Sequence, residues 1–78
     1  MSYTLYILRC ADNTLYTGIT TDIVRRLMEH NSSDLGAKYT HSRRPCILVH
    51  SEGWYTHSEA LKREIAIKKM KRGEKLKI

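Results

Sequence analysis

The chain has 78 residues, of which 41% are hydrophobic and 28% are charged, and these values are typical of one small folded domain. No apolar run approaches the roughly 18–20 residues that a bilayer-spanning helix requires. The N-terminus lacks the basic and apolar regions of a secretory signal. We therefore expect a single domain over residues 1–78, located in the cytoplasm and not in a membrane.

Basic residues exceed acidic ones, with 14 Lys and Arg against 8 Asp and Glu and a net charge of +6. Such a surplus favours an anionic partner, with nucleic acid ahead of an acidic membrane surface or protein, while solubility alone is the plainer alternative. Cys10 and Cys46 are too few for a disulfide framework, so we expect free thiols. With the four histidines they match no structural zinc spacing.

The first 19 residues predict a β-hairpin. Tyr3–Arg9 is rich in β-forming residues and apolar on both faces, which is typical of a central strand. The turn-forming residues 11–13 follow, and Leu15–Ile19 returns as a second strand. A helix is then expected from about Asp22 to Asn31, because residues 23, 24, 27 and 28 form one apolar stripe. A loop is expected from Ser32 to about Pro45.

The second half of the chain predicts a third strand and a long helix. Cys46–Ser51 is a short apolar run. Thr56 and Glu59 have the spacing of a capping box, so a helix is expected to follow as far as about Lys71, with Gly73 ending it. Residues 74–78 are expected to add a last turn or to dock two apolar side chains.

The order ββαβα predicts an α+β fold, with a small three-stranded antiparallel sheet flanked by helices and a short C-terminal helix as an option. Residues 59–78 hold eight Lys or Arg and three Glu, so most of the positive surplus lies on the second helix and its tail. Such a helix can neutralise phosphates, although a solvated basic face is about as good an interpretation.

Glu64 is unusual because it lies along the apolar stripe of the second helix. It falls between Ala60 and Leu61, one turn earlier, and Ile67, one turn later. A carboxylate facing the domain needs a partner, because burying an unpaired charge is costly. The alternatives are a structural ion pair with an Arg or Lys, which pattern alone favours, and a divalent cation that prefers oxygen ligands.

Arg26 and His30 are four residues apart and share one face of the first helix. An Arg fork suits a phosphate, and a neighbouring His can hold or pass a proton. Tyr6 and Tyr16 occupy even positions in adjacent strands and are expected on one face of the sheet. Their phenols would be poor bases unless nearby cations, such as Arg26 and a metal, lower the pKa. Simple packing of each residue is the alternative in every case.

Together these residues resemble the GIY-YIG nuclease domain over essentially the whole chain. Thr4-Leu5-Tyr6 stands at the family's first triplet and Tyr16-Thr17-Gly18 at its second, and the step from Tyr6 to Tyr16 is ten residues, as is normal for the family. The segment from Tyr16 to His30 is similar to the family's strand-to-helix segment. Residues 36–40 and 43–45 resemble the small stand-alone bacterial members, and the UvrC N-terminal domain and Slx-type nucleases are more distant relatives. Thr4, Leu5 and Thr17 replace the family's usual residues at what are mainly packing positions.

The resemblance implies an endonuclease that hydrolyses DNA phosphodiester bonds with one Mg²⁺ or Mn²⁺ ion. Its implied catalytic residues are Tyr6, Tyr16, Arg26, His30 and Glu64. Glu64 would hold the metal, Arg26 would stabilise charge on the phosphorane, and one of the tyrosines, assisted by His30, would activate water.

The residues expected to bind nucleic acid are Lys38, Arg43, Arg44 and Lys68. Gly18 is expected to have a structural role, because it lets the backbone pass closely where a side chain would block the cleft. We expect DNA rather than RNA as the substrate, in flaps, branches or damaged sites of repair or recombination. A partner protein or a homodimer is a further expectation. The alternatives are a catalytically inactive nucleic-acid-binding module and, less favoured, a protein-interaction domain.

Overall fold

Strand β1 (Tyr3–Arg9) is the centre of a three-stranded antiparallel sheet in the computed structural model, which describes residues 1–32 and 38–78. It pairs with β2 (Leu15–Thr20) on one side and with β3 (Ile47–Tyr55) on the other. The predicted hairpin and the central position of the first strand are therefore confirmed, as is the α+β class.

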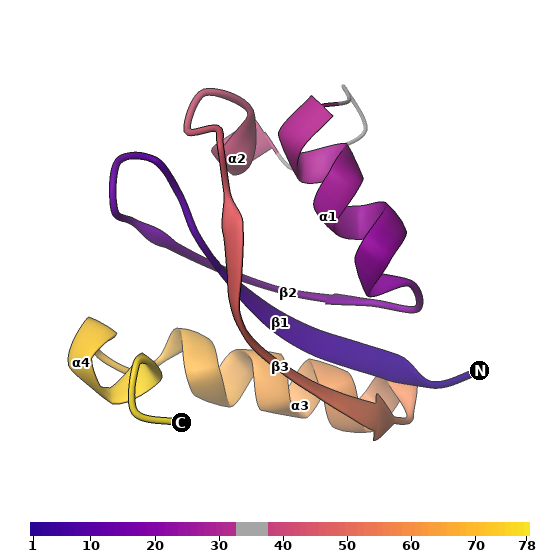
Figure 1. Ribbon diagram of the computed structural model, residues 1–78. Helices are drawn as coiled ribbons and strands as arrows, with labels where there is room; N and C mark the ends of the chain where they lie inside the picture. Colours follow the sequence, from indigo (N-terminus) through magenta and orange to yellow (C-terminus); the bar gives the residue numbers. More distant parts are fainter. Residues whose placement is uncertain (33–37) are drawn as a thin grey trace.

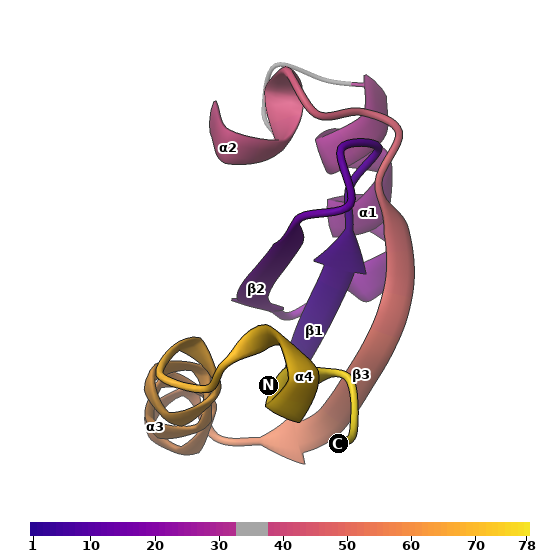
Figure 2. The same ribbon diagram turned by 90° about the vertical axis from the view of Figure 1, so that its left-hand side faces the viewer.

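The two faces of the sheet are covered by different helices, as Figures 1 and 2 show. Helices α1 (Ile23–Ser32) and α2 (Lys38–His41) lie on one side, and α3 (His57–Lys68) and α4 (Arg72–Lys75) lie on the other. Because β1 side chains alternate, it contributes to both cores. Tyr6 and Leu8 belong to the core under α1, and Leu5 and Ile7 pack with Ile67 of α3.

The two cysteines lie side by side where β1 ends and β3 begins. Cys10 and Cys46 are free, their sulfur atoms are 3.3 Å apart and both side chains are buried. Burial raises the pKa of the Cys46 thiol to about 12, so this thiol stays protonated at neutral pH. The expectation of free thiols is confirmed.

The helix boundaries confirm some predictions and correct others. Asp22 accepts a hydrogen bond from the Arg25 backbone at 3.1 Å, which begins α1 one residue after the predicted start. The predicted capping box of Thr56 and Glu59 is confirmed at the start of α3. The predicted end of that helix at Lys71 was wrong, because α3 ends at Lys68 and Lys69 caps it in a right-handed conformation.

Gly73 was expected to end the long helix. It lies instead inside the short helix α4. Helix α4 is held against the hairpin turn, because the Arg72 guanidinium donates hydrogen bonds to the Asn13 backbone oxygen and to its side chain. This long-range contact fixes α4 beside the hairpin turn. Of the two apolar side chains considered for docking there, Leu76 is 52% exposed and Ile78 is 38% exposed.

Two further elements differ from the sequence prediction. The segment expected to be a loop contains α2, while the part of that loop at residues 33–37 lies outside the described residues. Strand β3 continues to Tyr55 instead of ending at Ser51. Its pairing with β1 shifts register twice, and Trp54 has a left-handed φ of 68° and an exposed side chain. Because of these irregularities, apolar and polar residues do not alternate regularly along β3. The sequence pattern therefore did not predict that the strand continues beyond Ser51.

Candidate active site

Tyr6 and His30 form the buried centre of the candidate site. The Tyr6 hydroxyl lies 2.8 Å from His30 Nε2, although the two residues are 24 positions apart in the chain. Tyr6 is 1% exposed and His30 is fully buried. The i, i+4 spacing of Arg26 and His30 on α1 brings both side chains to the same phenol.

Gly18 explains how the Tyr6 ring fits between the strands. It lies directly opposite Tyr6 in the β1–β2 ladder. A Cβ atom at position 18 would be 2.7 Å from the Tyr6 hydroxyl oxygen and 3.1 Å from the Tyr16 ring. Position 18 therefore needs a glycine for space, and its φ is not in the left-handed region.

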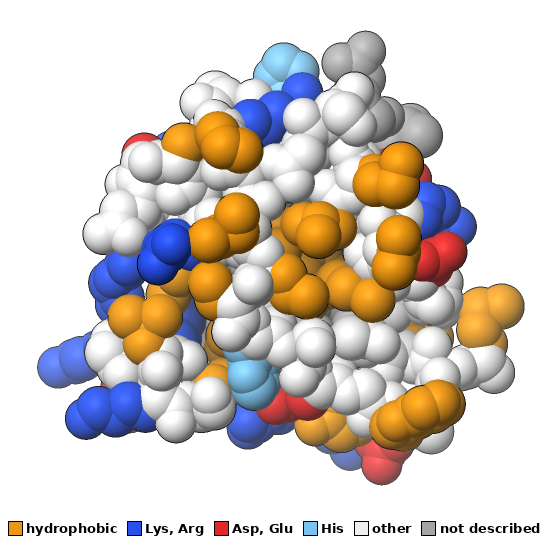
Figure 3. Space-filling model, in the orientation of Figure 1, with side chains coloured by type: hydrophobic (Ala, Val, Ile, Leu, Met, Phe, Trp, Pro, Cys, Tyr) orange, Lys and Arg blue, Asp and Glu red, His pale blue; other side chains and the backbone are white. Residues whose placement is uncertain are grey.

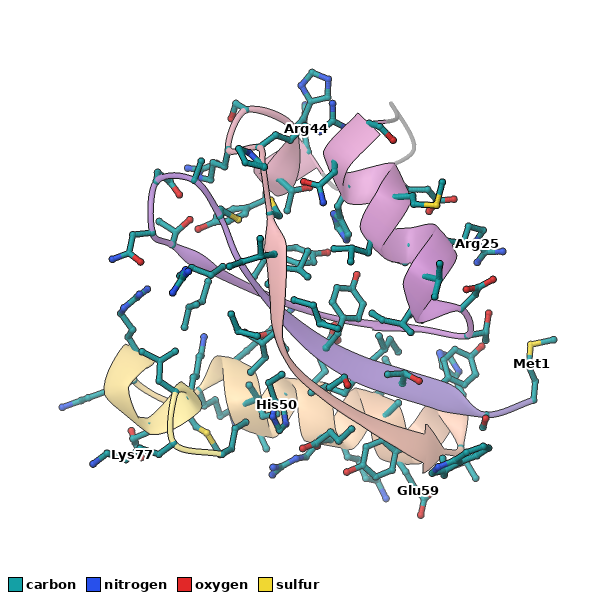
Figure 4. All side chains as sticks on the ribbon, viewed as in Figure 1. Met1, Arg25, Arg44, His50, Glu59 and Lys77 are labelled. Carbon is teal, nitrogen blue, oxygen red and sulfur yellow. The ribbon has the colours of Figure 1, made fainter. Side chains whose placement is uncertain are left out.

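Arg26 acts on the Tyr6 hydroxyl from the side of the helix. Its positive charge lies near enough to lower the pKa of the phenol, and its guanidinium donates a hydrogen bond to Glu29 at 3.0 Å. About a quarter of the Arg26 side chain is exposed, so the guanidinium can still reach an anion at the surface. A neighbouring arginine, Arg25, points away from the sheet into solvent (Figure 4).

The protonation states differ from the sequence expectation for Tyr6. Burial raises the pKa of Tyr6 to about 12, although the bound Arg26 guanidinium opposes this. Arg26 lowers the pKa of this phenol, as expected, but the loss of water around the buried ring outweighs this one cation. Burial, and then Arg26, lower the pKa of His30 to about 4, so His30 is neutral at pH 7.

Tyr16 is the more accessible of the two hairpin tyrosines. Its ring centroid is 6.2 Å from that of Tyr6 and 5.0 Å from that of His30, so the predicted shared face is observed. Tyr16 is half-buried, and no described residue forms a hydrogen bond with its hydroxyl. Tyr39 of α2 lies beside Tyr16, with ring centroids 5.9 Å apart, and was not among the predicted site residues.

Thr40 is the second residue of α2 that sequence reasoning missed. It is fully buried, and its Oγ1 lies 2.7 Å from His30 Nδ1. Thr40 lies within the segment expected to be a loop, so no periodic pattern connected it with the first helix. The only local signal was its place next to Tyr39 in the segment that resembles stand-alone GIY-YIG proteins.

Glu64 approaches the cluster from α3, on the other side of the sheet. Its negative charge contributes to the raised pKa of Tyr6, which places it within electrostatic reach of the phenol. The carboxylate is largely shielded, with 19% of its side chain exposed, and its ion partner is Lys68 one turn along the same helix, at 3.6 Å. A lysine is one of the two partners expected from the sequence, while Arg26 pairs with Glu29 on its own helix.

The donor set fits a magnesium-type ion held by one carboxylate. The described residues contain no group of three or more His, Cys, Asp or Glu that could hold a metal by themselves. Mg²⁺ commonly uses only one or two protein carboxylates and completes its shell with water and substrate phosphate oxygens. Because the long ion pair with the exposed Lys68 is weak, Glu64 retains the capacity to bind such a cation.

The basic residues expected to contact nucleic acid have different surroundings. Arg43 pairs with Asp12 at 2.9 Å and lies 4.1 Å above the Tyr39 ring. Arg44 donates to the backbone oxygens of His30 and Glu29 beside the last turn of α1 (Figure 4). Both arginines therefore support the fold around the cluster, in addition to any contact with a ligand.

Lys38 and Lys68 lie on the surface, at the start of α2 and the end of α3. Lys and Arg side chains also gather around α4 and the neighbouring part of α3, at the lower left of Figure 3. Two surface hollows, of about 380 and 250 Å³, lie elsewhere and are lined by none of the five predicted catalytic residues. Tyr16 and Arg26 are partly exposed beside the buried Tyr6 and His30, and an exposed site of this kind suits a polymer better than an enclosed small molecule.

Comparison with known proteins identifies the same segment. The GIY-YIG catalytic-domain family model matches residues 2–77. The UPF0213 protein DP2720 of Desulfotalea psychrophila is 62% identical over 66 residues, which cover 85% of this chain and 60% of that protein. A UPF0213 protein of Syntrophus aciditrophicus is 60% identical over 74 residues, covering 95% of this chain and 85% of its own length. This chain therefore spans less than two thirds of the length of the first of these relatives.

Solved structures show the same fold. The solution structure of EF2693 from E. faecalis has a TM-score of 0.68 and 47% identity, over 99% of this chain and 81% of the other. That of the UPF0213 protein BH0048 from Bacillus halodurans has a TM-score of 0.61 and 40% identity, with the same coverage. No described helix is both long and apolar enough to cross a membrane.

Proposed function

Because this chain belongs to the GIY-YIG family, whose catalytic domain suggests nuclease activity, we propose that it is a metal-dependent endonuclease acting on DNA. The observation that carries the proposal is the convergence of Tyr6, Tyr16, Arg26 and His30 on one face of the sheet, within electrostatic reach of Glu64. The buried phenol and imidazole lie beside a guanidinium that is still partly exposed, an arrangement that can bind and polarise a phosphate.

Each side chain is assigned a role by its surroundings. Glu64 would hold a Mg²⁺ or Mn²⁺ ion, which supplies Lewis-acid stabilisation of charge on phosphate oxygens when bound. The partly exposed Arg26 guanidinium binds the scissile phosphate and stabilises the charge that grows in the transition state. These two groups oppose the same negative charge from different elements of the fold.

The two tyrosines have different roles because their exposure differs. The half-buried Tyr16, whose hydroxyl has no partner among the described residues, orients the attacking water. Tyr6 is buried and keeps its proton, since burial raises the pKa of its phenol to about 12. Tyr6 and His30 together hold Arg26 in position at the edge of the site.

The open site and the net charge of +6 support DNA as the substrate, and branched, flapped or damaged DNA is the proposed class. Lys38, Lys68 and the basic side chains of α3 and α4 are proposed to contact the phosphates on either side of the site. Binding should therefore weaken steeply as salt is raised.

The test is incubation of the purified protein with linear, nicked, flapped and branched DNA in the presence of Mg²⁺, Mn²⁺ or EDTA. We expect cleavage of at least one substrate with either metal and none with EDTA. Binding without metal-dependent product on every substrate would instead support the inactive nucleic-acid-binding module. The ion pair between Glu64 and Lys68 is the observation that favours this second candidate, because it gives the carboxylate a structural partner.

A further inference from the structure

Three buried side chains from three elements form a continuous hydrogen-bonded row. Thr40 Oγ1 of α2 lies 2.7 Å from His30 Nδ1 of α1, and His30 Nε2 lies 2.8 Å from the Tyr6 hydroxyl of β1. Each of the three residues is at most 1% exposed. Water cannot replace any of these partners without a change in the packing, so the directions of the protons in the row are fixed by the side chains themselves.

The direction of the Tyr6 proton follows from Arg26. The positive charge of Arg26 lies near the Tyr6 phenol and favours its oxygen, while a guanidinium carries only N–H donors and cannot accept the hydroxyl proton. The hydroxyl proton then remains to be donated, and His30 Nε2 is the acceptor at hydrogen-bond distance. Nε2 must therefore carry no proton.

The state of the other imidazole nitrogen follows in turn. His30 is fully buried beside the Arg26 guanidinium and is neutral at pH 7, so it carries a single proton. With Nε2 unprotonated, that proton is on Nδ1, where the Thr40 hydroxyl oxygen accepts it.

We propose that Thr40 is a positioning residue of this site, which sets the Nδ1-protonated tautomer of His30 and thereby directs the Tyr6 hydroxyl toward Nε2 and leaves the phenol oxygen to Arg26. The consequence for cleavage rests on the proposed function, whereas the tautomer itself does not.

Loss of the Thr40 hydroxyl would reverse the direction in which the protons are donated along the row. A buried Nδ1–H without an acceptor is costly, so the proton would move to Nε2. Nε2–H would then donate to the Tyr6 oxygen in competition with Arg26, and the Tyr6 proton would lose its acceptor. The guanidinium would be released from the position in which it meets a phosphate.

The test uses ¹⁵N NMR of the histidine side chains in the wild type, Thr40→Val and Thr40→Ser, with His30→Gln identifying the His30 signals. Imidazole nitrogen shifts distinguish a protonated from an unprotonated nitrogen. We expect protonated Nδ1 and bare Nε2 in the wild type and in Thr40→Ser, and a shift toward protonated Nε2 in Thr40→Val, which keeps the shape but lacks the hydroxyl. Protonated Nε2 in the wild type would overturn the inference even if Thr40→Val did not fold.

Cleavage measurements separate this inference from the proposed function. Thr40→Val should cleave DNA about 10–100-fold more slowly, the usual cost of removing a hydrogen-bond partner that orients a site histidine, and Thr40→Ser should restore the rate. An unchanged tautomer and rate in a folded Thr40→Val would refute the role of Thr40. A wild type that shows the expected tautomer but cleaves no DNA would refute the proposed function and leave the tautomer assignment in place.

Discussion

Gly18 lies opposite Tyr6 in the β1–β2 ladder, and a Cβ atom at that position would be 2.7 Å from the Tyr6 hydroxyl oxygen. The Tyr6 ring is buried and held by His30, so it cannot move aside cheaply. The glycine of this strand is thus required by the phenol of its neighbour, which links the fold of the hairpin directly to the candidate site.

Gly18→Ala should therefore destabilise the protein by about 1–3 kcal/mol, the usual cost of overpacking a core, as measured by urea unfolding. Gly73→Ala is the matched control, because nothing lies within 4 Å of its added Cβ and the residue is helical. That control should raise the stability by about 0.5–1 kcal/mol. Equal effects of the two substitutions would contradict the steric role of Gly18.

The pH dependence of stability should report the burial of His30. Its pKa falls from 6.5 to about 4 on folding, so the unfolded chain takes up a proton that the folded protein does not. Stability is therefore full above pH 6.5 and should fall by about 3 kcal/mol as the pH drops toward 4. Burial opposes the shift of Glu52, but Arg63 and its other partners lower the pKa of this carboxyl from 4.5 to about 2, so Glu52 acts mainly below pH 4.5 and the range from pH 6.5 to 4.5 reports His30.

Denaturant unfolding between pH 7 and 4 measures this effect in the wild type and in His30→Gln. The variant should lose most of the slope between pH 6.5 and 4.5, while His57→Gln, which changes an exposed histidine, should keep it. A slope that survives in His30→Gln would show that another group is responsible.

Arg26→Lys should reduce DNA cleavage about 100–1000-fold, because an ammonium group cannot contact the phenol and a phosphate with a planar fork. DNA binding, followed by fluorescence anisotropy, should change far less. Arg25→Lys is the matched control, since the Arg25 side chain is 60% exposed and points away from the sheet. Equal losses in both variants would indicate a general charge effect rather than a role for Arg26 at the reacting phosphate.

The local periodicities of the sequence were sufficient to predict much of this arrangement. Alternation along the hairpin placed Tyr6 and Tyr16 on one face, and the four-residue step on α1 placed Arg26 and His30 on one side of the helix. These relations depend only on strand and helix geometry, which neighbouring residues determine.

Long-range packing was not predictable in the same way. Thr40 meets His30 through an unpredicted helix, and Arg72 reaches Asn13 across 59 positions. The direction of the Tyr6 pKa also required knowledge of its burial, because the sequence suggested a cation nearby but not the loss of water around the phenol. Sequence patterns identify which residues share a face of a strand or helix. How deeply a side chain is buried, and which distant residues it contacts, depend on how the helices pack against the sheet.

The central claim is that the Glu64 carboxylate serves chemistry rather than stability, and comparison with a structural carboxylate tests it. Glu52 is bound by Arg63, His50 and Tyr55 between β3 and α3, whereas the ion pair of Glu64 within the described part of the chain is the long contact with Lys68. Glu52→Gln should therefore lower stability and still cleave DNA at temperatures where it is folded.

The most direct measurement is the rate of Mg²⁺-dependent DNA cleavage by Glu64→Gln, with unfolding and DNA binding measured on the same sample. We predict a folded protein that binds DNA as the wild type does and cleaves it at least about 100-fold more slowly. Wild-type cleavage by Glu64→Gln, or a loss of stability as large as that of Glu52→Gln, would contradict the account.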